Sequence, residues 1–370
     1  MGCIKKIGLL ICGIVLITQS CVRNNLEDCP PSVRYAISFE YLLHTFVDPR
    51  GVPVNRFEND VEKMYIYVFD DATGLCILAD TTQRGPFTND LLYYLPFSGG
   101  TYDIIVWGWG ENPFSPQLDR RTGVLPRIPI EVGKTTIDEA KFVLFELNNN
   151  VNNMVDGKIE KTFYGEIPDK YIPPFISDVD TVSLRNITKA IRVIIPDIEN
   201  ASTEIPDWKN NLKITIEGDN AAYKIGKTGG LHATEIDGTL GSVIYNPYQT
   251  LYTDSVLVND PIYTNHFDGS RTTGLVVDIS TLRLVEHDTN MKVVLTWTLG
   301  TEVKRLELPL LELLERHPAF IWSGNLQRYL DVEDRWEIIF RITDTHVSVA
   351  TEVMQWHIVK QDVGIGGILQ

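Results

Sequence analysis

The sequence predicts an all-β protein of two tandem β-sandwich domains, with one short helix in the second domain. Many short segments rich in Val, Ile, Thr and Tyr alternate apolar and polar residues with the period of two of a half-buried strand. Clusters of Gly, Pro, Asn and Asp separate these segments, and the strands do not alternate regularly with helices, as a parallel sheet would require. At 370 residues with 44% hydrophobic content, the chain is long and apolar enough for two domains.

Residues 1–20 are predicted to be a lipoprotein signal peptide. Lys5 and Lys6 precede an apolar run over residues 7–17, which is shorter than the roughly 17–25 residues of a membrane-spanning helix. The next residues, "ITQS" at 17–20, resemble a lipobox before Cys21. Cys21 is therefore expected to become an acylated N-terminus, and two or three acyl chains hold a protein stably on a membrane. Ordinary secretion with cleavage nearby and a retained anchor helix are the alternatives.

The first domain is predicted over residues 33–170, after a polar tether at 21–32. "VRYAISFEY" at 33–41 alternates as a strand, with one apolar face made of Val33, Tyr35, Ile37, Phe39 and Tyr41. "KMYIYVFDDATGLCIL" at 63–78 predicts a hairpin that turns at "DDATG". "LLYYLPFSGGTYDIIVWGWG" at 91–110 predicts two strands separated by a Gly-Gly turn.

The second domain is predicted over residues 171–360, because three prolines in "GEIPDKYIPPFISDVD" at 165–180 indicate a domain boundary nearby. Four further strands are predicted in "SLRNITKAIRVIIP", "LKITIEG", "GLVVDISTLRLV" and "MKVVLTWTL". A helix is predicted at 308–317, where four leucines form one face, and Pro318 ends it. "DRWEIIFRIT" then returns to a strand, and residues 361–370 form a C-terminal tail.

The charge of the chain makes nucleic acid an improbable partner. The formal net charge is −16, and removal of Lys5 and Lys6 with the signal peptide leaves about −18. After lipidation of Cys21, only Cys29 and Cys76 would remain. They either form one disulfide bond or stay as two unpaired thiols.

No sequence motif indicates a catalytic site. We therefore predict that the protein is not an enzyme and that it needs no cofactor or metal. G-x-S-x-G, H-E-x-x-H and C-x-x-C are missing, and the seven histidines lack metal-ligand spacing. Trp107 and Trp109 lie two residues apart on one strand face, where they are either core residues or a platform for a sugar ring. The acidic pairs Asp178/Asp180 and Glu333/Asp334 are expected to be solvated turn residues rather than calcium ligands.

The C-terminal tail is apolar although the last strand is complete before it. Its apolar residues are Val363, Ile365, Ile368 and Leu369. Such a tail can dock on its own domain, fray, or contact another subunit by strand addition.

Several segments in order resemble one family, the fimbrium anchoring subunits of the type V pili of Bacteroidota. They are Cys21 with "DCPP" after it, "YIYVFDDATGLC", "GGTYDIIVWGWG", "FYG" at 163–165, "LRNITKAIRV" and "LQRYLDVEDRWEIIFRI". The resemblance covers nearly the whole chain after Cys21. It implies two transthyretin-like β-sandwich domains in an outer-membrane lipoprotein, exposed at the cell surface, that anchors the fimbrium base and limits its length.

The resemblance also implies a mode of assembly. Shaft subunits of these pili lose their first strand to a protease, and the open groove accepts a donor strand from a neighbour. An anchor is expected to keep residues 33–41, because a cut beyond them would separate the fold from Cys21. The shaft subunit would then bind elsewhere, and the tail residues 363–369 are the candidate. The alternative function is that of a surface glycan-binding lipoprotein that uses Trp107 and Trp109. The sequence does not decide whether the lipid lies in the inner or the outer leaflet of the membrane.

Overall fold

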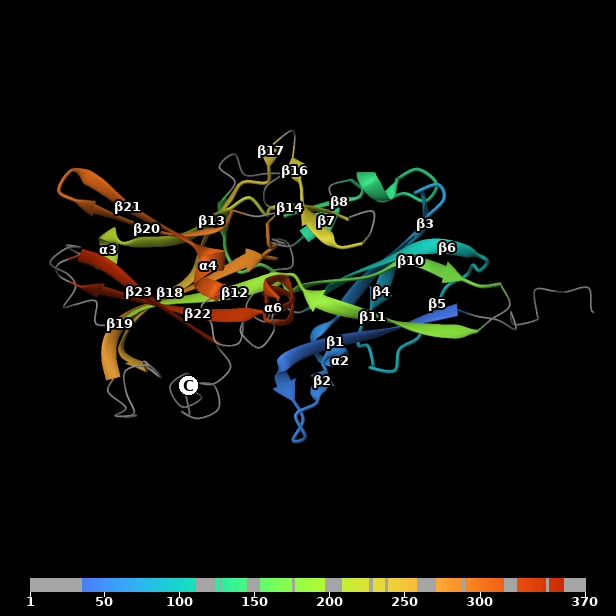
Figure 1. The fold of residues 1–370 in the computed structure, drawn as a ribbon, viewed down its shortest axis with the longest axis horizontal. Coiled ribbons are helices and arrows are strands. Elements are labelled where there is room, and N and C mark those ends of the chain that lie inside the picture. The colour runs from blue at the N-terminus through green and yellow to red at the C-terminus, as the bar shows by residue number, and fades with distance from the viewer. Residues whose placement is uncertain are drawn as a thin grey trace, which may run out of the picture.

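A computed structural model describes residues 35–110, 124–126, 128–144, 154–174, 177–196, 208–225, 229–236, 239–257, 271–287, 290–315, 325–343 and 346–355. The fold is all-β, as predicted, and its sheets form a sandwich-like arrangement. Figure 1 shows an elongated molecule, with the N-terminal strands gathered at one end and the C-terminal strands at the other. The sheets meet in the middle, where strands from both halves of the sequence lie together.

The first sheet contains eight strands of the described residues, in the order β2-β1-β11-β10-β6-β3-β4, with β5 beside β1. Their bounds are β1 Tyr35–Val47, β2 Pro53–Asn55, β3 Lys63–Asp70, β4 Cys76–Arg84, β5 Tyr93–Tyr94, β6 Gly100–Trp109, β10 Thr162–Ile172 and β11 Asp178–Asn186. The predicted hairpin is present as β3 and β4. The two segments on either side of Gly99–Gly100 are β5 and β6, although β5 pairs with β1 rather than with β6.

This first sheet bends over itself and encloses a core of its own. β10 and β11 pair through only two residue positions, so β1 and β11 form one layer while β10, β6 and β3 form the other. Apolar side chains from both layers fill the space between them, among them Tyr35, Ile37, Phe39, Tyr41, Met64, Ile66, Val68, Ile104, Val106, Phe163, Val182 and Leu184. The predicted apolar face of β1 is therefore confirmed for residues 35–41.

The second face of β3, β6 and β10 is buried as well. Tyr67, Trp107 and Tyr164 point away from the first core into a larger one that extends through both halves of the molecule. A four-stranded sheet covers this face, in the order β15-β14-β8-β7. Its bounds are β7 Val124–Pro126, β8 Lys141–Leu144, β14 Ala222–Ile225 and β15 Leu231–Ala233. Strands that are covered on both sides read as nearly continuous apolar runs, as "YIYVF" and "IIVW" do.

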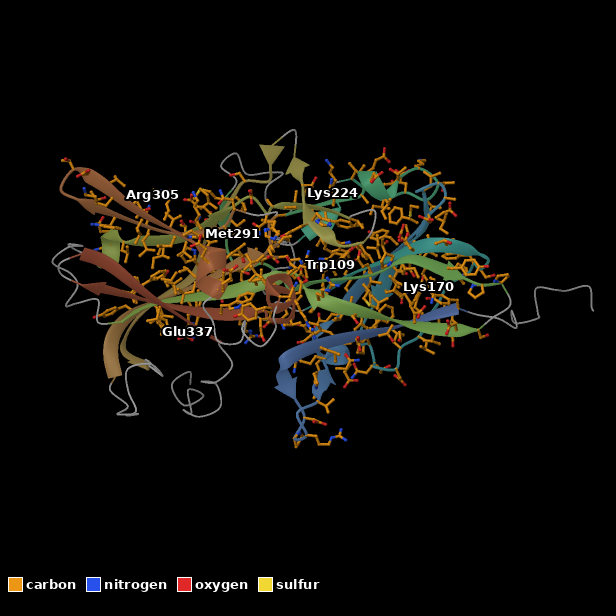
Figure 2. The ribbon with its side chains drawn as sticks, viewed as in Figure 1. Trp109, Lys170, Lys224, Met291, Arg305 and Glu337 are labelled. Carbon is orange, nitrogen blue, oxygen red and sulfur yellow. The ribbon has the colours of Figure 1, made fainter. Side chains whose placement is uncertain are left out.

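The second large sheet contains nine strands of the described residues, in the order β21-β20-β13-β18-β19-β12-β22-β23, with β9 beside β18. Their bounds are β9 Met154–Asp156, β12 Thr188–Pro196, β13 Lys213–Gly218, β18 Val243–Leu257, β19 Arg271–Leu282, β20 Lys292–Leu299, β21 Glu302–Pro309, β22 Arg335–Thr343 and β23 His346–Gln355. A small hairpin joins β16 Glu235–Ile236 to β17 Thr239–Leu240. In Figure 2, Trp109 lies near the middle of the molecule, while Arg305 and Lys170 lie toward opposite ends.

Helices are few and short in the described part of the chain. They are α2 Phe57–Asp60, α3 Trp208–Asn211, α4 Leu310–Glu315, α6 Leu326–Val332 and the 3₁₀ turn η2 Ile137–Glu139. The predicted helix at 308–317 is α4, which buries Leu310, Leu313 and Leu314. The prediction of a single helix in the second half was wrong, because α3 and α6 form as well. Among the described helices, none has the length and apolar character needed to cross a bilayer.

The chain passes from the first sheet to the second at Ile187. β11 ends at Asn186 and β12 begins at Thr188, so one buried residue lies between the two sheets. The predicted domain boundary at residues 170 and 171 stays a prediction about folding units. By sheet membership, however, β11 belongs with the first half.

Candidate functional site

β1 is the first described strand after Cys21, the expected lipid attachment point, in the sequence. It pairs in parallel with β11 over seven residue positions, from Tyr35 opposite Asp178 to Tyr41 opposite Leu184. The alternation of the sequence turns Ile37 and Phe39 into the first core, where both are at most 2% exposed. Phe39 stacks on Phe57 with ring centroids 5.3 Å apart. β1 is thus an integral strand of the sheet rather than an appended segment.

On the face of β1 and β11 that is turned away from the first core, polar side chains bond across the two strands. Ser38 and Thr181 share a hydrogen bond of 2.8 Å between their hydroxyl oxygens, and Ser183 donates to the carboxylate of Glu40. Cross-strand polar pairs of this kind stabilise a sheet by roughly 0.2–1 kcal/mol each. The pairing of β1 with β11 is therefore supported on both faces of the sheet.

The other edge of β1 is also occupied. β5 pairs with its first residues, and the backbone N–H of Leu95 donates to the carbonyl oxygen of Tyr35 at 3.0 Å. Toward its end, the N–H of Arg56 donates to the carbonyl of Tyr41 at 2.8 Å, and Asn55 Oδ1 accepts the N–H of Tyr41 at 2.9 Å. Because both edges are paired, β1 lies within the sheet and not at its rim.

An ion pair marks the end where β1 begins. The carboxylate of Asp180 accepts hydrogen bonds from the Tyr35 hydroxyl and the Lys170 ammonium group. Partial burial alone would raise the pKa of Asp180, but the bonds from Lys170 and Tyr35 outweigh it and lower that pKa. Burial and the bond to Asp180 raise the pKa of Tyr35. The first residue of β1 is thereby held to both β10 and β11.

Helix α6 packs against the other end of the β1–β11 pair. It contacts both strands, and its N-cap residue Asn325 accepts the backbone N–H of Arg328 at 2.8 Å. Its side chains Leu326, Tyr329 and Leu330 are buried in the large core. The last residues of α6 and the turn after it carry the charged side chains that bond to the crossing between the two sheets.

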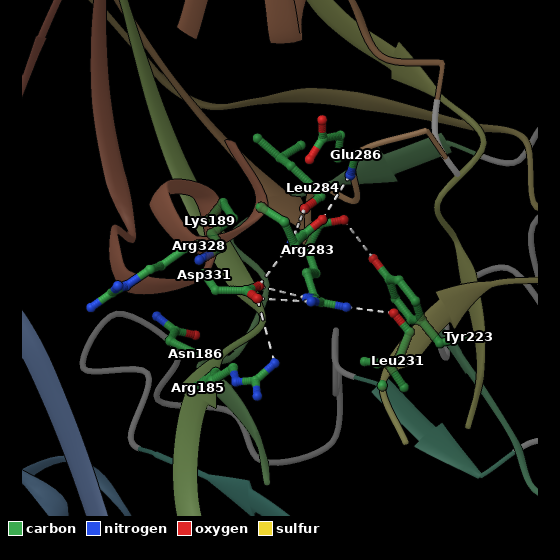
Figure 3. Close-up of polar contacts among 12 residues, drawn as sticks. Arg185, Asn186, Lys189, Tyr223, Leu231, Arg283, Leu284, Glu286, Arg328 and Asp331 are labelled. Atoms are coloured by element: carbon green, nitrogen blue, oxygen red, sulfur yellow. Dashed lines mark hydrogen bonds and ion pairs between the residues drawn. The ribbon is translucent and has the colours of Figure 1, made fainter. Parts of the chain in front are cut away.

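The charged network at this junction is centred on Asp331 (Figure 3). Arg283 donates to both carboxylate oxygens of Asp331, through Nε at 2.8 Å and a terminal nitrogen at 2.9 Å, and Arg185 of β11 lies 3.4 Å from the same carboxylate. Arg283 also donates to the carbonyl of Leu231, and its own carbonyl accepts the Tyr223 hydroxyl. Burial would raise the pKa of Asp331, but Arg283 outweighs burial and holds that pKa below its usual range.

Lys189 lies beside this network and is 1% exposed. Its Nζ donates to the carbonyl oxygen of Glu333 at 2.6 Å and lies 5.6 Å from the centre of the Trp336 ring. Burial lowers the pKa of Lys189 to about 8, although the carboxylates of Asp331 and Asp334 act in the opposite direction. β12, the strand that follows the crossing at Ile187, therefore carries a buried lysine whose pKa is lowered.

The residues singled out from sequence fall into two groups. Cys21 and the tail residues Val363, Ile365, Ile368 and Leu369 lie outside the described residues. Trp107 and Trp109 are 0% and 4% exposed, so both are core residues. The interpretation of these indoles as a glycan platform was wrong, because a buried ring offers no face to a sugar.

The acidic pairs also differ from their prediction as solvated turn residues. Asp178 and Asp180 lie within β11, while Glu333 and Asp334 are 5% and 9% exposed. Asp334 accepts a hydrogen bond of 3.4 Å from Asn186 at the junction. Asp178 is exposed, whereas the carboxylate of Asp180 bonds to Tyr35 and Lys170 and that of Asp334 bonds to Asn186.

Two further groups of the described residues carry metal-ligating or nucleophilic side chains. Asp71, Asp103 and Asp169 each place one carboxylate oxygen within 4.8 Å of the others. The three residues are far apart in sequence, so no motif signalled this cluster. Cys76 is a free thiol that is fully buried, and burial raises its pKa. The interpretation of Cys76 as an unpaired thiol in a strand agrees with this geometry.

The comparison with protein families matches almost the whole chain. The family described as fimbrillin-A associated anchor proteins Mfa1 and Mfa2 matches residues 26–362. The chain belongs to this fimbrial anchor family. Membership associates it with cell-surface fimbriae and with fimbrial subunits as partners, and the family is one of structural proteins. No curated protein sequence matches the chain.

Solved structures share the fold of this family member. A candidate polysaccharide-binding protein from Bacteroides thetaiotaomicron has a TM-score of 0.61 at 20% identity, covering 89% of this chain and 99% of that one. A candidate adhesin from the same organism has a TM-score of 0.60 at 18% identity, covering 89% and 98%. The fimbrial anchor protein Mfa2 from Porphyromonas gingivalis has a TM-score of 0.54 at 16% identity, covering 87% and 98%.

Proposed function

We propose that this protein is an outer-membrane lipoprotein, acylated on Cys21, that anchors the base of a fimbrium to the cell surface and limits fimbrial length without catalysis. Membership of the fimbrial anchor family supports the anchoring role. The observation that carries the membrane attachment is the complete integration of β1 into the first sheet. Only residues 22–34 separate Cys21 from Tyr35, so β1 is the strand through which the lipid is joined to the fold.

The energetics of β1 favour its retention in the mature protein. Its side chains Tyr35, Ile37, Phe39 and Tyr41 are each at most 2% exposed. Burial of an Ile or Phe side chain stabilises a fold by about 1.5–3 kcal/mol, so Ile37 and Phe39 alone contribute about 3–6 kcal/mol. A whole domain is stable by only about 5–15 kcal/mol. Loss of β1 would therefore release the lipid and destabilise the first sheet.

Retention of β1 also accounts for a limit on length. β1 occupies the position beside β11, where a shaft subunit would accept a donor strand. A subunit whose own strand stays in place adds no further subunit at that groove, so assembly ends at the anchor. The supply of anchor relative to shaft subunits would then set how soon growth ends.

The contact with the first shaft subunit is assigned to the C-terminal tail. Val363, Ile365, Ile368 and Leu369 follow β23, the last strand in the order of the second sheet. Strand addition requires a donor with apolar side chains at alternate positions, which Val363, Ile365 and Leu369 occupy, whereas Ile368 would lie on the other face. A double substitution, Ile365→Asp with Leu369→Asp, should abolish capture of shaft subunits while the fold and the membrane attachment remain.

Fractionation of cells tests the proposal. Cys21→Ala should leave a folded protein that is found in the medium together with its fimbriae, whereas Cys29→Ala should stay in the outer membrane as the matched control. Mass spectrometry should detect an acylated peptide that begins at Cys21, and cross-links should join the tail to a fimbrial subunit. Retention of Cys21→Ala in the membrane fraction would refute the lipid attachment. Cross-links to glycan-uptake proteins in place of fimbrial subunits would refute the anchoring role.

A further inference from the structure

We propose that the β1–β11 pair is a mechanical clamp that resists tension between the lipid and the fimbrium by being loaded in shear. The inference rests on the proposed function, which fixes where the tension enters: at Tyr35 from the membrane, and in the second half of the molecule from the fimbrium. The clamp consists of residues 35–41 of β1 and residues 178–184 of β11.

The direction of the two strands decides how tension acts on the clamp. β1 and β11 are parallel, so Tyr35 lies opposite Asp178 at the end of β11 that is farther from the second sheet. β11 leaves the clamp after Leu184, about 20 Å along the strand, and continues through Ile187 into β12. Tension therefore pulls the two strands from opposite ends and slides one along the other.

Sliding loads every bond of the clamp at once. The hydrogen bonds of all seven residue pairs must break together, because the force acts along the strands and not perpendicular to them at one end. An antiparallel partner would place both pulled ends at the same end of the ladder, and the strands would then peel apart one pair at a time. The side-chain bonds of Ser38 to Thr181 and of Ser183 to Glu40 add to the same resistance.

β11 is held firmly to the part of the molecule that receives the opposing pull. Arg185 lies 3.4 Å from the Asp331 carboxylate, Asn186 donates to Asp334, and Lys189 donates to the carbonyl of Glu333. Asp331 is in turn bound by Arg283, which follows β19 in the second sheet. The buried network in Figure 3 thus passes tension from β11 to the second sheet without relying on the backbone at Ile187 alone.

Single-molecule force spectroscopy on the non-lipidated chain, residues 21–370, tests the proposal. In the first geometry, one handle precedes residue 21 and the other is attached through Thr301→Cys in the exposed turn between β20 and β21. In the second geometry, Arg50→Cys replaces the N-terminal handle. The side chain of Arg50 is 82% exposed and follows β1 in the chain, so this pull enters at the end where β11 also leaves the pair and peels the two strands apart instead of shearing them. Cys21 and Cys29 are changed to Ser in both.

The first unfolding event should need at least about twofold more force in the first geometry, because forced unfolding follows the barrier along the pulled direction. Ser38→Ala with Ser183→Ala should lower that force by a larger factor than the force in the second geometry, because shear loads both side-chain bonds at once. These two substitutions touch no core residue, so folding is retained. Equal forces in the two geometries, or a weaker first geometry, would overturn the clamp.

The same measurements separate this inference from the function on which it rests. If Cys21→Ala releases fimbriae while the two pulling geometries give equal forces, the anchor stands and the clamp fails. If the force difference is found but Cys21→Ala stays in the membrane, the strand pair is strong but receives no tension from a lipid. The clamp then fails together with the proposed attachment.

Discussion

Trp107 of β6 stacks on Phe142 of β8, with ring centroids 4.0 Å apart and ring planes inclined by 27°. The contact joins the first sheet to the four-stranded sheet, which in turn contains β14 from the second half of the sequence. Trp107, which the sequence left as either a sugar platform or a core residue, therefore forms part of the connection between the halves.

Trp107→Ala should lower the free energy of unfolding by about 3–5 kcal/mol, since truncation of a large buried ring leaves a cavity. Denaturant unfolding followed by circular dichroism measures this change. Tyr171→Ala is the matched control, because Tyr171 is 57% exposed and its removal leaves no cavity. A Trp107 variant as stable as the control would contradict the assignment of this ring to the core.

Asp331→Asn should destabilise the protein by about 3–5 kcal/mol, because it leaves Arg283 buried without its charge partner. The side chains of Arg283 and Asp331 are only 6% and 12% exposed. The double variant Arg283→Met with Asp331→Leu should recover much of the loss, as an apolar pair of similar volume. If the double variant is as unstable as the sum of its two single variants, the ion pair is not what couples these positions.

The stability of the protein should depend on pH through Lys189. Its pKa is about 8 in the folded protein and 10.5 in a solvated chain, so the unfolded chain binds the proton more tightly. The cost of burying the charge is fully present below pH 8 and disappears as the pH rises toward 10.5. Relative to Lys189→Met, the native chain should therefore gain about 3 kcal/mol of unfolding free energy across this window.

Unfolding titrations at several pH values between 7 and 10.5 measure this difference. Lys224→Met on the exposed side of β14 is the matched control for loss of a lysine. A gap between the native chain and Lys189→Met that is the same at every pH would show that Lys189 does not release its proton in the folded protein.

Cleavage of the chain after β1 should leave β1 bound. The turn at residues 48–52 is exposed and tightly hydrogen-bonded, and a protease recognition sequence can replace it. After the cut, seven backbone pairs and four buried side chains should hold the N-terminal fragment in place. Size-exclusion chromatography should show both fragments in one peak. The same cut in an Ile37→Asp variant should release the fragment, and release without that substitution would count against integration of β1.

Local pattern predicted several strands but neither their partners nor every strand, since the 15-residue strand β18 has no counterpart among the predicted segments. The alternation in residues 35–41 indicated both the strand and its buried face, because side chains of a strand alternate between the two faces. The parallel pairing of Tyr35 with Asp178 joins residues more than a hundred positions apart, and no local signal encodes it. The strand that contains "IIVW" is covered on both faces, and β8, which covers Trp107, is a separate segment of the sequence. The local pattern therefore could not decide whether Trp107 is a core residue or an exposed one.

The junction was beyond prediction for a different reason. In sequence, Asp331 and Arg283 are indistinguishable from surface charges, since burial depends on what tertiary packing places around them. Helix α6 spans only Leu326–Val332, too short for its apolar spacing to stand out from the strand that follows. The leucines of α4 at 310–314 gave a clearer signal because they are nearly continuous.

The strand pairings also bear on the order in which this chain can fold during export. β8 at 141–144 needs β14 at 222–225, β9 at 154–156 needs β18 at 243–257, and β12 needs β22 at 335–343. β8, β9 and β12 therefore cannot form these pairings until the later strands have been synthesised, and long-range pairings of this kind form slowly. On the proposed route through a secretion channel, the second sheet therefore cannot close before the C-terminal half has followed, whereas every strand of the first sheet lies within residues 35–186.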